Sequence, residues 1–186
     1  FNIQGVELIA VNTDAQALHF CKGPKGYPKK ILIGKDTTKG LGTGMDVMLG
    51  KKAAEESSKE ISESLKGSDM VFVTCGFGGG TGSGAAPIIA GLAKSLGILT
   101  IAVVTTPFSF EGEQRKRVAE NALQKLKEEV DSLIIISNDK LLNIIDEKTT
   151  VSNAFLICDE VLKEAVQSIT DLILVPGIIN IDFSSV

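Results

Sequence analysis

The chain has 186 residues and carries 19 Lys and Arg against 23 Asp and Glu, which gives a formal net charge of −4. With 44% hydrophobic and 23% charged residues, it has enough apolar area for one globular core, and too many charges for an integral membrane protein. The mildly acidic balance also argues against a nucleic-acid partner, because proteins that bind nucleic acids carry a clear excess of basic residues.

Short, continuously apolar runs recur along the chain and predict the strands of a parallel sheet that is buried on both faces. In chain order, these runs span residues 6–11, 31–33, 70–75, 99–104, 133–136 and 172–175. Segments with helical periodicity lie between them, at 49–65, 85–96, 113–130 and 153–169. This alternation predicts an α/β fold, a doubly wound and mainly parallel sheet with helices on both faces.

Residues at the ends of the predicted helices support this assignment of strands and helices. Ser152 or Asn153 is expected to cap the last helix, and His19 is expected at the end of a short helix. The cysteines, Cys21, Cys75 and Cys158, are odd in number and far apart, which predicts reduced thiols rather than disulfides or a zinc site.

A glycine-rich loop follows the predicted strand at 70–75 and leads into a helix at about residue 84. Its glycine and hydroxyl residues are Gly76, Gly78, Gly79, Gly80, Thr81, Gly82, Ser83 and Gly84. Glycine lets a backbone approach a ligand closely, and free N–H groups at a helix N-terminus bind phosphate oxygens, so the loop predicts a phosphate site. A flexible turn without a ligand is the simple alternative.

A dinucleotide-binding loop is a second alternative, because the glycine spacing is close to the Rossmann pattern. Against it, the loop follows an internal strand rather than the first strand, and no acid follows the next strand. The P-loop of nucleotide triphosphatases is excluded, because no Gly-Lys-Ser/Thr sequence closes the segment.

Residues 79–84 read GGTGSG, and with the surrounding chain they resemble the tubulin/FtsZ superfamily, in particular the FtsZ family of bacterial and plastid cell-division GTPases. Further segments that carry the resemblance occur in family order at 12–18, 50–56, 107–112, 130–133, 138–142 and 176–183. The resemblance implies bound GTP or GDP with Mg²⁺, and no residue of the chain is assigned as a direct metal ligand.

The resemblance assigns two segments to the phosphates. The phosphate loop is matched by Gly78, Gly79, Gly80, Thr81 and Gly82. A second loop, which senses the terminal phosphate, is matched by Thr43, Gly44 and Asp46, where the family commonly has Ala-Gly-Ala-Asn over residues 43–46. An acid at position 46 is unfavourable beside phosphates unless a cation intervenes.

Ribose and base recognition are matched by Glu111, Arg115, Asn138, Phe155 and Asp159. Phe155 and Asp159 are four residues apart and share one helix face, so the ring can stack on a purine while the carboxylate accepts from guanine N–H groups. Without the resemblance, Phe155 is an ordinary core residue, and Glu111 with Arg115 is an exposed pair within one helix.

The resemblance also implies a head-to-tail homopolymer in which a loop of the next subunit completes GTP hydrolysis. That loop is matched by Asn180, Asp182 and Ser185, and Ser185 stands where the family has a second acid. Because a serine hydroxyl does not carry the negative charge that orients water and the cation, we expect hydrolysis to be impaired.

The chain is therefore expected to be a single GTP-binding domain over 1–186, incomplete at its N-terminus, that ends in the helix at about 153–169, a strand and the catalytic loop at 177–186. The function implied is a filament subunit of cell division, at the division site in the cytoplasm or in the plastid stroma, with division-machinery adaptors as further partners. The alternatives are a filament protein or modulator with little hydrolysis and, resting only on the glycine loop, an NAD(P)-binding oxidoreductase domain.

Overall fold

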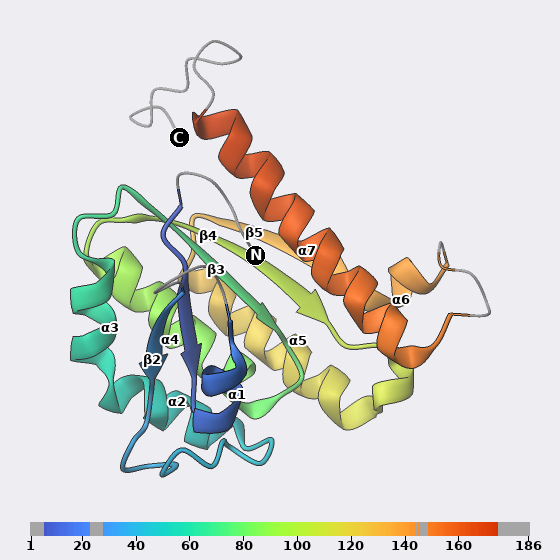
Figure 1. Cartoon of the computed structure of the whole chain (residues 1–186), viewed down its shortest axis with the longest axis horizontal. Helices are drawn as coiled ribbons and strands as arrows, with labels where there is room; N and C mark the ends of the chain where they lie inside the picture. The colour runs from blue at the N-terminus through green and yellow to red at the C-terminus, as the bar shows by residue number, and fades with distance from the viewer. Residues whose placement is uncertain (1–5, 23–27, 144, 146–148, 175–186) are drawn as a thin grey trace.

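The computed structural model describes residues 6–22, 28–143, 145 and 149–174 (Figure 1). The elements in chain order are β1 (Ile9–Asn12), α1 (Ala15–Phe20), β2 (Lys29–Leu32), α2 (Val47–Glu56), α3 (Ser58–Leu65), β3 (Met70–Gly76), α4 (Gly80–Ser95), β4 (Leu99–Thr106), the 3₁₀ helix η1 (Ser109–Glu111), α5 (Glu113–Glu128), β5 (Ser132–Ser137), α6 (Asn138–Leu142) and α7 (Val151–Leu174). Strands and helices alternate as the sequence predicts.

All strand pairs in the described residues are parallel, and they form two sheets, one of β1 and β2 and one in the order β3-β4-β5. Helices cover both faces of the larger sheet (Figure 1). Val103 faces α7, whereas its neighbours Ala102 and Val104 face α4 and α5. Apolar residues on both faces explain why the strands read as continuous apolar runs.

Helices α2 and α4 join the two sheets, and glycine makes their close contact possible. A Cβ built on Gly50 would lie 2.2 Å from the carbonyl oxygen of Gly80, and one on Gly84 would lie 2.3 Å from the carbonyl oxygen of Val47. Only glycine lets the two backbones approach this closely. The apolar residues around this contact, including Ile31, Ala53 and Ala93, form the core that links the smaller sheet to α4.

Two predicted elements are wrong in number or type, and the helix predicted at 85–96 begins earlier, at Gly80. The predicted helix at 49–65 is two helices that meet at Ser57, although hydrogen bonds continue through the junction from Ser57 N to Ala53 O and from Ile61 N to Ser57 O. The strand predicted at 172–175 is a helix up to Leu174, the last residue of α7. The segment continues α7, because no helix breaker precedes Pro176.

Smaller differences concern the helix ends. The last helix begins at Val151, and its cap is Thr150, whose Oγ1 accepts a hydrogen bond from Asn153 N at 3.3 Å. His19 lies in the last turn of α1, as predicted, and the three cysteines are free. Within the described residues, no helix combines the length and apolar character needed to cross a bilayer.

Candidate functional site

The carboxyl ends of β3, β4 and β5 lie at one edge of the larger sheet. The register pairs Gly76 with Thr105, and Thr106 with Ser137, so the loops that follow these strands begin side by side. Ligands of open α/β sheets bind at this edge. Three of the predicted parts of the site follow these strand ends in order: the glycine loop follows β3, Glu111 follows β4, and Asn138 follows β5.

The glycine loop curls tightly over the end of β3. Gly78 has a φ of +103°, and its N–H donates to Ser83 Oγ at 3.0 Å. A Cβ on Gly82 would lie 2.5 Å from the carbonyl oxygen of Gly76. At Gly79, the N-cap residue of α4, none of the described side chains acts as a cap, and no described atom lies within 4 Å of a built Cβ. The first N–H groups of α4 therefore have no side-chain cap among the described residues, and an anion can accept from them.

Three threonine hydroxyls meet at the start of α4. Thr81 Oγ1 lies 2.7 Å from Thr13 Oγ1 and 3.4 Å from Thr43 Oγ1. Thr13 follows β1 and is fully buried, and Thr43 precedes α2. The two segments predicted to contact phosphates are therefore adjacent. Thr13 has no role predicted from the sequence, although it lies within the segment 12–18 that carries the family resemblance.

Asp46 lies beside the glycine loop, but its carboxylate is hydrogen-bonded to its own helix. Asp46 Oδ1 accepts from Met48 N at 2.7 Å and from Leu49 N at 3.2 Å, as the N-cap of α2. The backbone of Asp46, in contrast, lies within 2.8 Å of a Cβ built on Gly80. This explains how an acid is accommodated near a phosphate site, because its charge is held at the positive end of a helix.

Glu111 and Arg115 do not share one helix. Glu111 ends η1, Arg115 lies in α5, and between them Gly112 has a φ of +101°. Glu111 Oε1 accepts from Phe108 N at 2.9 Å, and Glu111 Oε2 lies 3.5 Å from Arg115 Nη1. The alternative of an exposed pair within one helix is therefore wrong, since the Glu111 side chain is only 15% exposed and closes the loop after β4.

The base side of the site contains a buried acceptor without a partner. Asn138 is 4% exposed, and its Oδ1 has no hydrogen-bond partner within the described part of the chain. A buried polar atom of this kind is costly unless a ligand or water satisfies it. Asn138 begins α6 directly after β5, so this acceptor lies at the same sheet edge as the glycine loop.

Phe155 and Asp159 lie one turn apart on α7. The ring of Phe155 meets Phe108 and Phe110 edge to face, with centroids 5.2 Å and 6.4 Å apart, and stays 39% exposed. It is therefore not a core residue, and part of its surface remains available for stacking. Partial desolvation raises the pKa of the Asp159 carboxyl above its usual value.

Packing beneath these residues brings α6 and α7 together. Phe108, Ala154 and Cys158 form a small buried cluster, against which Leu141 and Leu142 of α6 pack. Asp139 Oδ1 accepts a hydrogen bond from Ser109 N at 2.7 Å, and this bond connects α6 to the loop after β4. Sequence pattern does not reveal this role of Asp139, because it depends on a contact with a residue 30 positions away in the chain.

The predicted catalytic residues Asn180, Asp182 and Ser185 lie outside the described residues. Within the described ranges, no group of three or more His, Cys, Asp or Glu side chains could hold a metal ion.

The chain is similar to known proteins over this whole region. Residues 1–146 match the family model described as Tubulin/FtsZ family, GTPase domain. A solved structure of an empty FtsZ dimer from M. jannaschii is 46% identical, with a TM-score of 0.91 over 98% of this chain and 52% of that chain. GDP-bound monomeric CetZ1 from Haloferax volcanii is 32% identical, with a TM-score of 0.73 over 85% of this chain and 48% of that chain.

A third structure, CetZ2 from Haloferax volcanii, was solved as a GTPγS-bound protofilament. It is 28% identical, with a TM-score of 0.76 over 96% of this chain and 52% of that chain. The present chain thus spans about half the length of each of these proteins.

Proposed function

Because the chain belongs to the tubulin/FtsZ family of GTPase domains, we propose that it binds GTP and GDP and assembles head to tail into filaments of cell division. The observation that carries the nucleotide proposal is the buried Oδ1 of Asn138, which has no hydrogen-bond partner in the described part of the chain and lies at the sheet edge where the glycine loop begins α4. This edge therefore offers donors for an anion at one end and an acceptor for an N–H group at the other.

The phosphates are proposed to lie against the start of α4. The backbone N–H groups of residues 79–82 would donate to phosphate oxygens, and the hydroxyls of Thr81 and Thr43 would add donors. The backbone of Gly44 would lie on the same side of the phosphates as Thr43. Mg²⁺ would accompany the nucleotide, because this ion is usually bound through phosphate oxygens and water with few protein ligands.

The sugar and the base are proposed to follow the sheet edge towards α7. Glu111 would accept from ribose hydroxyls, with Arg115 beside it. Phe155 would stack on the purine, and Asp159 would accept from the ring N–H and the amino group of guanine. Adenine lacks this pair of donors, so Asp159 would select GTP over ATP.

Hydrolysis is proposed to depend on a second copy of the chain. Asn180 and Asp182 would act on the nucleotide of the neighbouring subunit, and the filament would form at the division site in the cytoplasm or plastid stroma, with adaptors of the division machinery as partners. The CetZ2 relative was solved as a protofilament, which supports self-association. A filament protein with little hydrolysis is the second candidate, favoured by Ser185 in place of an acid.

Calorimetric titration of the full-length protein with GTP, GDP and ATP in the presence of magnesium tests the nucleotide proposal, with phosphate release and sedimentation measured on the same sample. We expect GTP and GDP to bind at least about tenfold more tightly than ATP, which corresponds to about 1.4 kcal/mol. Equal affinity for ATP would contradict the assignment of the base site. Filaments that form without phosphate release would favour the second candidate.

A further inference from the structure

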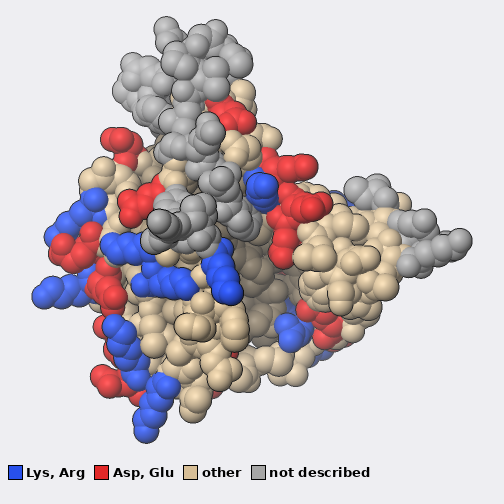
Figure 2. Space-filling view, in the orientation of Figure 1, with Lys and Arg blue, Asp and Glu red and all other residues tan. Residues whose placement is uncertain are grey.

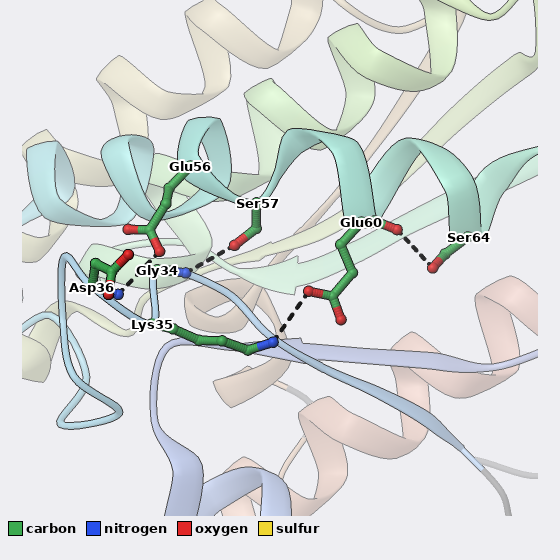
Figure 3. Close-up of polar contacts among 7 residues, drawn as sticks. All are labelled: Gly34, Lys35, Asp36, Glu56, Ser57, Glu60 and Ser64. Atoms are coloured by element: carbon green, nitrogen blue, oxygen red, sulfur yellow. Dashed lines mark hydrogen bonds and ion pairs between the residues drawn. The ribbon is translucent and has the colours of Figure 1, made fainter.

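The last residue of α2, Glu56, holds the loop that follows β2. Glu56 Oε1 accepts from Asp36 N at 3.0 Å (Figure 3). Glu56 Oε2 accepts from Thr37 N at 3.0 Å and from Thr37 Oγ1 at 2.6 Å. These hydrogen bonds, above all that from the Thr37 hydroxyl, lower the pKa of the Glu56 carboxyl, so it is ionised at neutral pH. Three donors thus converge on one carboxylate.

A second contact fixes the beginning of the same loop. Gly34 N donates to Ser57 Oγ at 3.0 Å (Figure 3). Gly34 has a φ of +67°, and a Cβ on it would lie 2.3 Å from Cβ of Ala53. The loop therefore starts in direct contact with the last turns of α2.

The other end of the loop reaches the phosphate side of the site. Thr38 Oγ1 donates to Gly34 O at 3.0 Å, and Gly42 N donates to Thr13 O at 3.2 Å. Thr43 then meets Thr81, and Asp46 caps the first turn of α2. Residues 34–46 therefore run back along α2 and are held by side chains at both of its ends.

The groove beside this contact gives no sign of a ligand of its own. Its lining alternates basic and acidic side chains, namely Lys29, Lys35, Lys59, Asp36, Glu56, Glu60 and Glu63. Lys35 and Glu60 pair across it at 3.4 Å (Figure 3), and Figure 2 shows both signs intermixed on the side of α3. Lys35, Glu56 and Glu60 therefore serve contacts within the chain.

We propose that Glu56 is a positioning residue for nucleotide binding, because its carboxylate holds the loop 34–46 so that Thr43 lies against Thr81. The helix that carries Glu56 is itself fixed against the phosphate loop, through the close approach of Gly50 to Gly80. This inference rests on the proposed function, in which Thr43 lies on the side of the terminal phosphate. Loss of the carboxylate should therefore weaken GTP binding more than GDP binding.

The variants follow from the donor pattern. Glu56→Gln keeps the side-chain size but places an NH₂ group among three donors, so at least one hydrogen bond is lost. Thr37→Val removes the hydroxyl from the opposite partner and keeps its backbone N–H. Glu55→Gln is the matched control, because Glu55 is the preceding residue of α2, is exposed, and pairs only with Lys51 at 3.6 Å among the described residues.

The first experiment measures the Kd of the full-length protein for GDP and for a non-hydrolysable GTP analogue. In Glu56→Gln we expect the Kd for the GTP analogue to rise about tenfold, the loss expected for one hydrogen bond to a charged group, and the Kd for GDP to rise less than about twofold. The double variant with Thr37→Val should be no weaker than Glu56→Gln alone, because both changes remove the same contact. Glu55→Gln should bind like the unchanged protein.

Equal losses for GTP and GDP, or losses matched by Glu55→Gln, would overturn the proposal and leave Glu56 with a purely structural role. Hydrogen exchange without nucleotide provides a second measurement that does not depend on the proposed function. Glu56→Gln should speed exchange as far along the loop as Gly42 N–H, which donates to Thr13 O. Faster exchange confined to Asp36 and Thr37 would also overturn the proposal, whereas failure of the unchanged protein to bind either nucleotide would count against the proposed function alone.

Discussion

Asn138 and Asp159 are polar side chains on the base side of the site, and each is placed at an energetic cost. Asn138 Oδ1 is buried without a hydrogen-bond partner among the described residues, and partial desolvation raises the pKa of Asp159. A ligand that brings N–H groups to both would relieve both costs. Guanine has such donors on its Watson–Crick edge, and adenine has an acceptor at its ring nitrogen there.

Replacing Asp159 tests this directly. In Asp159→Asn we expect GTP affinity to fall about tenfold or more and ATP affinity to stay unchanged, because the amide offers only one acceptor to two guanine donors. The melting temperature should not fall, since a partly desolvated charge is removed. Calorimetry and thermal unfolding measure both effects. Glu160→Gln, the adjacent exposed acid of α7, is the control, and an equal loss there would contradict the assignment.

The raised pKa of Asp159 also predicts a pH dependence. A carboxyl whose folded pKa lies above the ordinary 3.8 gains its proton earlier as the pH falls, and the protonated form no longer accepts two hydrogen bonds. GTP affinity should therefore decline on acidification from neutral pH, more steeply in the unchanged protein than in Asp159→Asn. Comparing the two proteins cancels the titration of the phosphates themselves. Parallel pH profiles would show that Asp159 does not contact the base.

Features of the site that are formed by residues close together in the sequence were predictable. The glycine loop and the shared helix face of Phe155 and Asp159 follow from spacing alone. The cap formed by Asp46 was missed, although an acid directly before an apolar helix is a recognisable cap signal. The contacts of Thr13 with Thr81 could not be read from spacing, because they join residues 68 positions apart.

Among the elements, α2 and α4 depend on glycine for their contact. Gly50→Ala places a Cβ 2.2 Å from a backbone oxygen, and neither helix can move without disturbing the core around Ala53. We expect a loss of about 1–3 kcal/mol in the free energy of unfolding, despite the better helix propensity of alanine. Urea-induced unfolding of the variant and the unchanged protein measures this loss in the free energy of unfolding. Gly79→Ala, where nothing lies within 4 Å of a built Cβ, should leave stability nearly unchanged, and equal losses would contradict the packing argument.

Element boundaries were predicted less well than element types. The periodicity of 49–65 continues through Ser57, so the pattern alone does not show that two helices meet there. The segment 172–174 is as apolar as a strand, but it lies at the end of the long helix α7 and continues that helix. Short apolar runs do not distinguish these cases, because the decision depends on which surface they pack against.

For the whole molecule, hydrolysis is expected to depend on contact between copies, and Ser185 is the sequence difference that bears on it. Ser185→Asp would restore the acid of the family pattern, so we expect faster phosphate release with unchanged GTP affinity, measured on assembled full-length protein. Ser184→Asp adds the same charge one residue earlier and is the control. No increase with Ser185→Asp, or an equal increase with the control, would contradict this role.

The fold class was predictable from the sequence, because apolar runs alternating with amphipathic helices favour a parallel sheet covered on both faces.

The fully parallel pairing of the described strands has a consequence for the kinetics of folding. Each strand reaches its partner only through a crossover that contains a helix, so neither sheet has a hairpin from which pairing can start. Loops must close before any ladder forms, which makes such pairing slow. Helices are therefore expected to form first in this chain, and the sheets last.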